Sequence, residues 1–233
     1  MKTHLLKKIK YFLALLILPF LLSCQKGFDV SEMSFPINMT VVKEKVKLEE
    51  DKSFSDMTRY YTTDKKAINF YGENFAGSNG TPPFTLDNKI SFYEENKSKK
   101  VDAYGIDINT TDEAEDFEKL IDSKLGKADF AYKNNDFSFT IWENTGKYYF
   151  FETNNTGELN GKKFKSCTLH VINPKNTFFV NYFIAGGFQY FGDYLYEKAK
   201  PEHQGKKFSY RDFIDVKEKE DGKDSYFLKD YVK

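Results

Sequence analysis

The sequence has few of the residues that most catalytic and recognition chemistry uses. Its 233 residues include three histidines, two cysteines, one tryptophan and six prolines. Two cysteines are too few for a disulfide-rich scaffold. Only Arg59 and Arg211 are arginines, so nearly all basic residues are lysines, which do not bind phosphate in the bidentate manner of arginine. Acidic and basic residues balance to a formal charge of zero, whereas nucleic-acid-binding proteins usually carry a basic excess. We therefore expect no nucleic-acid partner.

Motifs for metal binding and catalysis are also missing. The sequence has no HExxH, no CxxC, no GK[ST] phosphate loop and no GxSxG nucleophile elbow. Acidic residues cluster between Asp112 and Glu118, but neighbours on one helix cannot face each other across a cleft as a glycosidase pair must. We therefore predict no catalytic residue, no metal site and no cofactor.

Aromatic residues, in contrast, are abundant. The chain has 24 Phe and 16 Tyr, and several are adjacent, as in the run Tyr148 to Phe151. Neighbours on a strand point to opposite faces of a sheet, so such a run has two interpretations. Either helices pack on both faces of the sheet and the rings form an aromatic core, or some rings are exposed and bind a glycan, a peptide or a protein. For the second case, we expect Trp142, Tyr148 and Tyr149 to be the ligand-binding residues.

The N-terminal sequence predicts an export signal. Four lysines and no acid precede an apolar run from Tyr11 to Leu22. As a helix this run would be about 18 Å long, at ~1.5 Å per residue. A bilayer core is ~30 Å thick, so the run is too short to span it stably. A basic start followed by a short apolar run is typical of a secretory signal peptide.

The end of that run carries the one family resemblance in the chain. Leu21-Leu22-Ser23-Cys24 resembles the lipobox of bacterial lipoproteins. The resemblance implies a diacylglyceryl group on the Cys24 thiol, cleavage directly before Cys24 and acylation of the new N-terminus. The membrane would then be a partner through this lipid. Gln25 in place of Asp favours the outer membrane by the best-known sorting rule.

Beyond the lipobox, the chain resembles no family specifically enough to carry residue roles. We expect a signal peptide over 1–23, a tether over 24–35 and a single α+β domain over 36–233. The alternative is two small subdomains that meet near residue 110. Removal of the signal peptide takes away four lysines and no acid, which leaves a net charge of about −4 on the mature chain. The expected fold is mainly antiparallel sheet with about two packed helices.

Two helices are predicted from apolar periodicity. Phe117, Leu120, Ile121 and Leu125 form one stripe over 112–125, and Gly126 follows as a terminator. A second stripe favours a helix over 188–200. The remaining pattern predicts strands over 37–48, 89–94, 101–108, 136–142, 147–153, 163–172 and 177–185, and a hairpin of strands 57–62 and 66–71 around Asp64-Lys65. It also predicts a loop over 77–83 and a C-terminal hairpin over 208–232 that turns at Asp221-Gly222.

Cys167 would be the one free thiol of a lipidated chain. Alternation places it on the same strand face as Leu169 and Val171, with His170 on the opposite face. Cys167 is a buried small hydrophobic residue, a nucleophile or a site of intermolecular pairing, and a nucleophile needs a base close by. The opposite orientation of His170 argues against a Cys–His dyad.

These observations favour a non-catalytic, lipid-anchored protein of the cell envelope that binds a protein or a cell-wall component. A helix followed by an aromatic hairpin resembles small envelope lipoproteins that act as assembly factors or inhibitors, and an immunity-type protein would fit equally well. The other alternative is an envelope hydrolase whose carboxylates come from distant parts of the chain.

Overall fold

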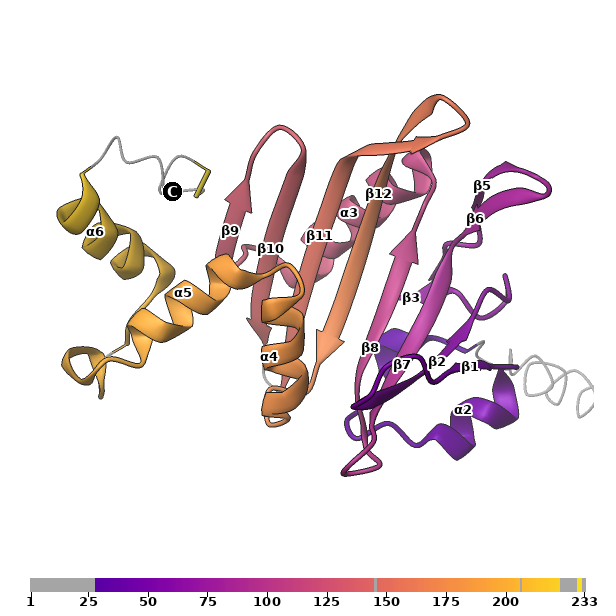
Figure 1. The fold of residues 1–233 in the computed structure, drawn as a ribbon, viewed down its shortest axis with the longest axis horizontal. Coiled ribbons are helices and arrows are strands. Elements are labelled where there is room, and N and C mark those ends of the chain that lie inside the picture. The colour runs from indigo at the N-terminus through magenta and orange to yellow at the C-terminus, as the bar shows by residue number, and fades with distance from the viewer. Residues whose placement is uncertain (1–27, 145, 206, 223–229, 232–233) are drawn as a thin grey trace, which may run out of the picture.

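One curved antiparallel sheet organises the molecule. The computed structural model describes residues 28–144, 146–205, 207–222 and 230–231; the predicted signal peptide and Cys24 lie outside them. Eight strands follow the order β1-β2-β7-β8-β12-β11-β10-β9, each antiparallel to its neighbours (Figure 1). Their bounds are β1 Glu49–Asp51, β2 Met57–Thr62, β7 Lys89–Glu95, β8 Val101–Ile108, β9 Phe130–Lys133, β10 Phe137–Asn144, β11 Lys147–Leu159 and β12 Lys162–Ile172.

Two small hairpins and five α-helices complete the described part of the chain. β3 (Asn69–Phe70) pairs with β4 (Glu73–Asn74), and β5 (Ser78–Thr81) pairs with β6 (Phe84–Asp87). The helices are α2 Met39–Lys45, α3 Thr111–Leu125, α4 Thr177–Ala185, α5 Gln189–Lys198 and α6 Tyr210–Asp221, with short 3-10 turns η1 Val30–Glu32 and η2 Pro201–His203. The predicted α+β class with an antiparallel sheet is confirmed, but the described residues contain five helices instead of about two. Pairing of β8 with β12 joins segments before and after residue 110 in one sheet.

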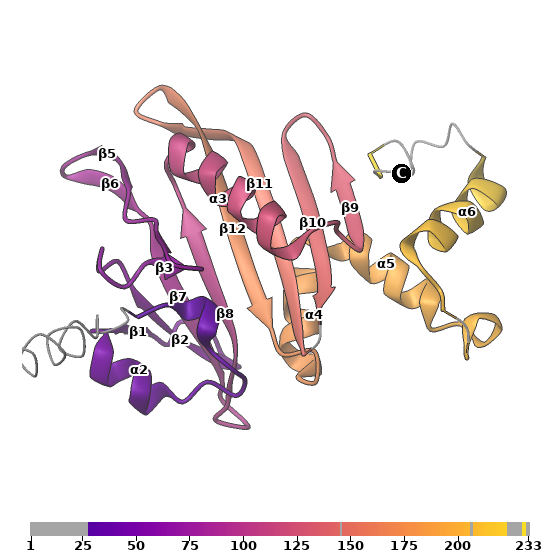
Figure 2. The same cartoon turned by 180° about the vertical axis from the view of Figure 1, so that it is seen from behind.

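Helix α3 and the N-terminal segments cover one face of the sheet. Figure 2 shows α3 crossing the back of the strands. Phe117 and Ile121 are fully buried against the sheet, and Leu120 lies at the margin, partly exposed. Gly126 ends the helix with a φ of 72°, in the left-handed region that glycine adopts without strain. The helix predicted over 112–125 is therefore confirmed.

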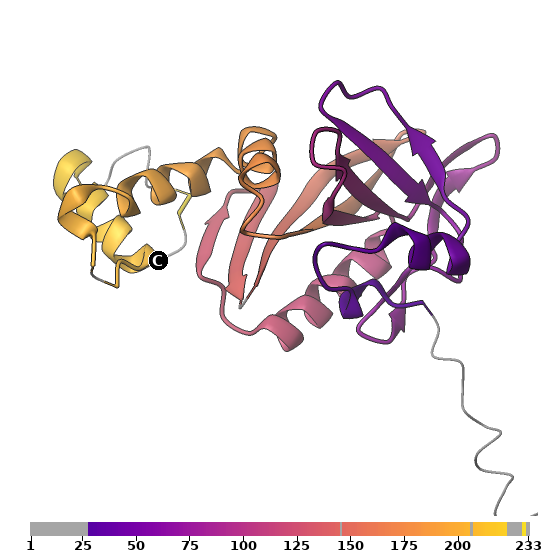
Figure 3. The same ribbon diagram turned by 90° about the horizontal axis from the view of Figure 1, so that it is seen from below.

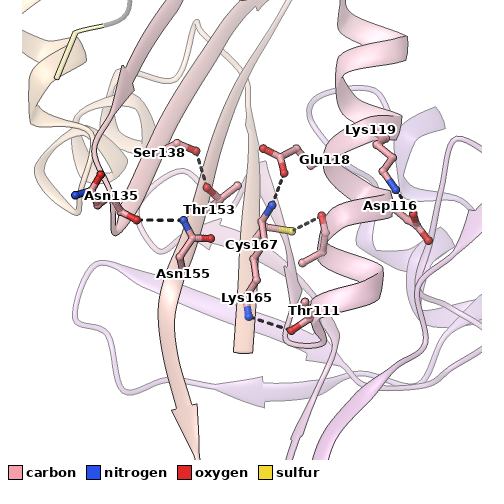
Figure 4. A network of polar contacts seen from close by, with 11 residues as sticks. Thr111, Asp116, Glu118, Lys119, Asn135, Ser138, Thr153, Asn155, Lys165 and Cys167 are labelled. Carbon is pink, nitrogen blue, oxygen red and sulfur yellow. Dashed lines mark hydrogen bonds and ion pairs between the residues drawn. The ribbon is translucent and has the colours of Figure 1, made fainter. Parts of the chain in front are cut away.

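Polar contacts fix α3 to strand β12 (Figure 4). The Lys165 ammonium pairs with the Glu118 carboxylate, and the Lys165 amide donates to Thr111 Oγ1 at 3.1 Å. One turn further along the helix, the Cys167 thiol lies 3.9 Å from the Ala114 carbonyl oxygen. Lys165 and Cys167 are alternate residues of β12. Their contacts with α3 therefore fix the position of the helix along this strand.

The C-terminal helices cover part of the opposite face. α4 lies in front of the lower part of the sheet in Figure 1, and α5 and α6 continue to one side of it. Their aromatic residues pack on the strands: Phe191 lies 5.5 Å from Phe130 and 5.4 Å from Phe150 between ring centroids. Seen from below, the sheet curves so that β1–β2 and α4 rise on the same side (Figure 3).

The aromatic run in β11 contributes to both cores. Tyr149 and Phe151 are buried in the cluster on the α3 side, whereas Phe150 is buried in the cluster under α4 and α5. This arrangement confirms the first interpretation of adjacent aromatics, a core with helices on each side of one sheet.

Three segments predicted as strands are helices. Residues 39–45 form α2, begun by Asn38, whose side chain accepts from the Thr40 amide at 3.0 Å. Residues 177–185 form α4, which begins after Asn176, whose side chain accepts a hydrogen bond from the Phe179 amide. The first half of the predicted C-terminal hairpin is instead α6: Ser209 and Asp212 form a capping box, and Gly222 ends the helix where a hairpin turn was expected. Most of the predicted second half lies outside the described residues. Asparagine and serine caps thus outweighed strand-like patterns.

Two turn assignments were also wrong. Residues 66–71 do not return along β2, because β2 pairs with β1 and β7, and β3 turns back on β4. The segment 77–83, predicted as a loop, contributes β5 and the turn to β6. The strands predicted over 57–62, 89–94, 101–108, 136–142, 147–153 and 163–172, and the helix over 188–200, are confirmed within a few residues.

The described part of the predicted tether packs on the sheet. Phe28 is 8% exposed and Val30 is fully buried, both in the cluster on the α3 side. Asp29 fixes this segment by accepting from the Gly72 amide at 2.7 Å. No helix among the described residues has the length and apolar character needed to cross a bilayer.

Packing of α3 predicts unequal costs for two truncations. Phe117→Ala should lower the free energy of unfolding by about 3–5 kcal/mol, because it leaves a cavity in a fully buried aromatic cluster. Leu120→Ala, on the same helix but partly exposed, should cost clearly less. Urea denaturation of both variants measures the difference; equal losses would contradict the packing of α3.

Candidate functional site on the uncovered part of the sheet

A cross-strand row of five residues lies where the C-terminal helices leave the sheet uncovered. The strand register places Lys89 opposite Asp107, Asp107 opposite Thr168, Thr168 opposite Glu152 and Glu152 opposite Phe139. All five are partly exposed, whereas the next row towards α4 is mostly buried. We call Lys89, Asp107, Thr168, Glu152 and Phe139 the open strip. In Figure 1, α4 lies in front of the lower part of the sheet, and no helix lies in front of its upper part.

Asp107 is already satisfied by its neighbours in the open strip. Its Oδ1 accepts a hydrogen bond from the Thr168 hydroxyl at 2.9 Å. Its Oδ2 lies 3.3 Å from the Lys89 ammonium, and the two side chains are 23% and 33% exposed. The pair therefore carries no net charge, and the Thr168 hydroxyl is occupied as a donor.

Glu152 has no such partner. Its carboxylate makes no hydrogen bond and no ion pair with any residue that the structure describes. Burial, and secondarily the charge of Asp107, raise the pKa of Glu152 above its usual range. Strands are spaced by ~4.8 Å, so the Cα atoms of the two acids lie roughly 10 Å apart on the same face. The open strip thus contains one uncompensated carboxylate.

His170 cannot supply the missing positive charge. It lies one row closer to α4, where its ring stacks on Phe183 at 4.2 Å between centroids. Its Nδ1 is shielded from solvent and has no hydrogen-bond partner among the described residues. Burial lowers the pKa of His170 to about 4, and the charge of Asp107 opposes this only in part. The imidazole is therefore neutral at pH 7.

Gly105 makes this close packing possible. A Cβ at this position would lie 3.0 Å from His170 Nδ1 and 3.1 Å from the Tyr93 hydroxyl. Both side chains reach over the bare backbone of β8, and Tyr93 is itself 7% exposed. Burial raises the pKa of Tyr93 strongly, so its phenol stays protonated at neutral pH.

The three predicted ligand-binding aromatics do not form an exposed surface. Trp142 is 2% exposed and donates from Nε1 to the Gly126 carbonyl at 2.8 Å. Tyr149 pairs with it across β10 and β11 and is also buried. Tyr148 points to the other face, where it packs against the cluster under α5. Trp142 and Tyr149 thus belong to the core on the α3 side, and Tyr148 is separated from them by the sheet.

Cys167 and His170 also lie on opposite faces of β12, as the alternation predicted. Cys167 is 2% exposed and packs in the cluster on the α3 side. Burial, and secondarily the charge of Glu118, raise the pKa of the Cys167 thiol well above its usual range. The thiolate needed for nucleophilic attack is therefore disfavoured, and Cys167 behaves as a small hydrophobic residue.

Two other polar groupings are occupied by their own contacts. Glu197, Glu202 and His203 bring ligand atoms within 4.8 Å of one another, as a metal site would require. However, Glu197 already pairs with Lys200 at 2.8 Å, His203 at 3.4 Å and Lys217 at 3.5 Å. Burial alone would raise the pKa of Glu197, but these partners lower it overall. This cluster is best explained as an ion-pair centre that joins α5, η2 and α6.

The second grouping lines a groove of about 650 Å³ between β4 and α3. Glu113, on its wall, accepts hydrogen bonds through Oε2 from the Gly77 amide, the Asn88 amide group and the Thr110 hydroxyl, at 2.5–2.9 Å. Asp116 pairs with Lys119 at 2.9 Å. These acids hold the β4–β5 connection and the helix start, and they leave the open strip as the better candidate.

Comparisons with known proteins add no family to this picture. No protein-family model matches the chain, and neither a curated protein nor a solved structure matches it.

The sequence predicts the strand faces of the open-strip residues but not that these residues are neighbours. Alternation placed Asp107, Thr168 and Glu152 on defined faces of their own strands. Their neighbourhood depends on the strand order, in which β12 lies between β8 and β11. Sequence distance hides that order, because α3, β9 and β10 separate β8 from β11 along the chain.

The raised pKa of Glu152 predicts a pH-dependent gain in stability on Glu152→Gln. Below the ordinary glutamate pKa the residue is protonated in both folded and unfolded states, so the substitution should change little. As pH rises through that value towards the raised folded pKa, the folded state resists ionisation and wild-type stability falls. The variant should therefore melt at a higher temperature than wild type at pH 7.

Thermal melts of both proteins from pH 3 to pH 7 measure this effect. Glu158→Gln, an exposed position on the same strand, is the matched control. A Glu152→Gln variant less stable than wild type at pH 7 would show that the carboxylate has a stabilising partner.

Proposed function

We propose that this protein is a lipid-anchored component of the bacterial cell envelope, placed at the outer membrane, that binds a protein or a cell-wall component without transforming it. The anchor is proposed from the lipobox-like sequence Leu21 to Cys24. The binding surface is the open strip. The single observation that carries this assignment is Glu152, a partly buried carboxylate with no partner among the described residues.

A binding role fits the way in which the sheet is covered. On the α3 face, a helix and the N-terminal segments bury the apolar side chains of the strands. On the other face, α4 to α6 cover the aromatic half and stop short of the polar half. An uncovered sheet surface bearing an unsatisfied charge lowers the stability of the free protein, and such local conflicts are typical of functional sites.

The large exposed hydrophobic side chains do not suggest another site. Those on the described residues are Val41, Phe84, Leu86, Tyr182 and Tyr196, which belong to α2, β6, α4 and α5. Apart from Phe84 and Leu86 on one hairpin, they are spread over separate elements. They therefore offer less support for a binding surface than the open strip does.

A second candidate function is an envelope hydrolase, and a third is an immunity-type or inhibitor lipoprotein. Two carboxylates on one sheet face, one with a raised pKa, are what a general acid and its partner require. Against this role, Asp107 is held by Lys89 and Thr168, and the neighbouring His170 is uncharged at neutral pH. An immunity-type or inhibitor lipoprotein would use the same surface for binding alone.

The anchor is tested by Cys24→Ala. The variant should lose lipidation and move from the membrane fraction to the soluble or precursor fraction, because acyl chains supply ~0.8 kcal/mol of membrane affinity per buried CH₂. Detergent-phase partitioning and mass spectrometry of the mature chain measure the outcome. Ser23→Ala, which keeps a small residue before the cysteine, is the control and should remain in the membrane fraction. Unchanged partitioning of Cys24→Ala would refute the anchor.

A further inference from the structure

The open strip has the chemistry of a receptor for a positively charged side chain. It contains one ion pair, Lys89 with Asp107, and one free carboxylate, Glu152, so its net charge is negative. Of the titratable groups packed beside it, His170 contributes no positive charge at neutral pH and the Tyr93 phenol stays protonated. A bound cation is therefore the group that would complete the row.

The neighbours of Glu152 favour a basic side chain over a bare metal ion. Phe139 lies directly opposite Glu152 on β10, and Thr168 lies opposite it on β12. An aromatic ring beside a carboxylate suits a guanidinium, which can stack on the ring while donating to both carboxylate oxygens. A metal would need several oxygen ligands, but both oxygens of Asp107 are engaged by Lys89 and Thr168.

The burial of Glu152 makes it a better anchor than surface acids. An exposed ion pair contributes little because water screens both charges. Glu152 is partly buried at the centre of the sheet, between strands whose backbone bonds fix its position. The position of Glu152 on the sheet is thus fixed by the backbone, and its partial burial reduces the screening that weakens exposed ion pairs.

From these observations, we propose that the open strip binds an arginine side chain of a protein partner, with Glu152 as the ionic anchor and Phe139 as the stacking surface. This inference rests on the proposed binding function and names the partner chemistry of the same site. It selects a protein partner with an exposed arginine over a neutral glycan, because sugar hydroxyls could donate hydrogen bonds to Glu152 but could not neutralise its charge.

The test uses acetyl-triarginine amide as the probe and acetyl-tricitrulline amide as its neutral isostere. Binding to the acylation-deficient full-length Cys24→Ala protein is followed at pH 7 by amide chemical shifts and by calorimetry. The arginine peptide should shift amides of β8, β11 and β12 around Glu152, and the citrulline peptide should not. Glu152→Gln should weaken binding about tenfold, the cost of one charge-assisted contact of about 1.4 kcal/mol.

Glu158→Gln is the matched control, because it removes the same charge from an exposed site on the same strand. It should change the affinity by less than twofold, and melting curves should show that both variants are folded. Equal loss in the two variants would mean that net charge alone attracts the peptide, and would overturn the proposal. Unchanged binding in Glu152→Gln, or shifts away from the open strip, would do the same.

A neutral chitotriose probe distinguishes a glycan from a protein partner. If chitotriose shifted the open strip and the arginine peptide did not, the arginine inference would fail while the binding function survived. Membrane fractionation of Cys24→Ala tests the anchor without involving this surface, so the two proposals can fail separately.

Discussion

Packing on both faces of one antiparallel sheet is the constraint on which the rest of this structure depends. Adjacent aromatics in β11 enter opposite cores, so the sheet needs helices on each side to remove them from water. Helix α3 and the N-terminal segments satisfy one face. Helices α4, α5 and α6 satisfy the aromatic half of the other face. The polar half of that face carries residues that can meet water, and it is left uncovered.

This division explains why the candidate site lies in the middle of the sheet. The strand register sets Lys89, Asp107, Thr168 and Glu152 side by side on neighbouring strands, and α4 closes the row next to them over His170. Three of the four side chains form a closed set of contacts. Glu152 makes no hydrogen bond or ion pair with these three side chains, so the open strip carries one carboxylate without a partner among the described residues. Backbone pairing of β8, β12 and β11 fixes the position of Glu152 on the sheet.

Local signals in the sequence were sufficient for the elements whose periodicity is unambiguous. The stripe Phe117 to Leu125 with Gly126 predicted α3, and alternation predicted that Cys167 and His170 lie on opposite faces of β12. The sequence was misleading where an apolar run had no clear period, as in 177–185, and where Asp221-Gly222 resembled a hairpin turn. The aromatic site predicted at Trp142 and Tyr149 is interior, because burial on two faces used those rings for packing. The open strip needed the strand order, which no local pattern contains.

The central claim is that Glu152 is a partly buried carboxylate without a stabilising partner. The most direct measurement is the pKa of its side-chain carboxyl, obtained by a carbon-detected NMR titration of the free protein, with the Glu152→Gln spectrum used for assignment. The account predicts a pKa for Glu152 above that of an ordinary exposed glutamate, because burial and the nearby charge of Asp107 disfavour ionisation. A value at or below the ordinary one would mean that the carboxylate is paired or fully hydrated, and the open strip would lose its role as a binding surface.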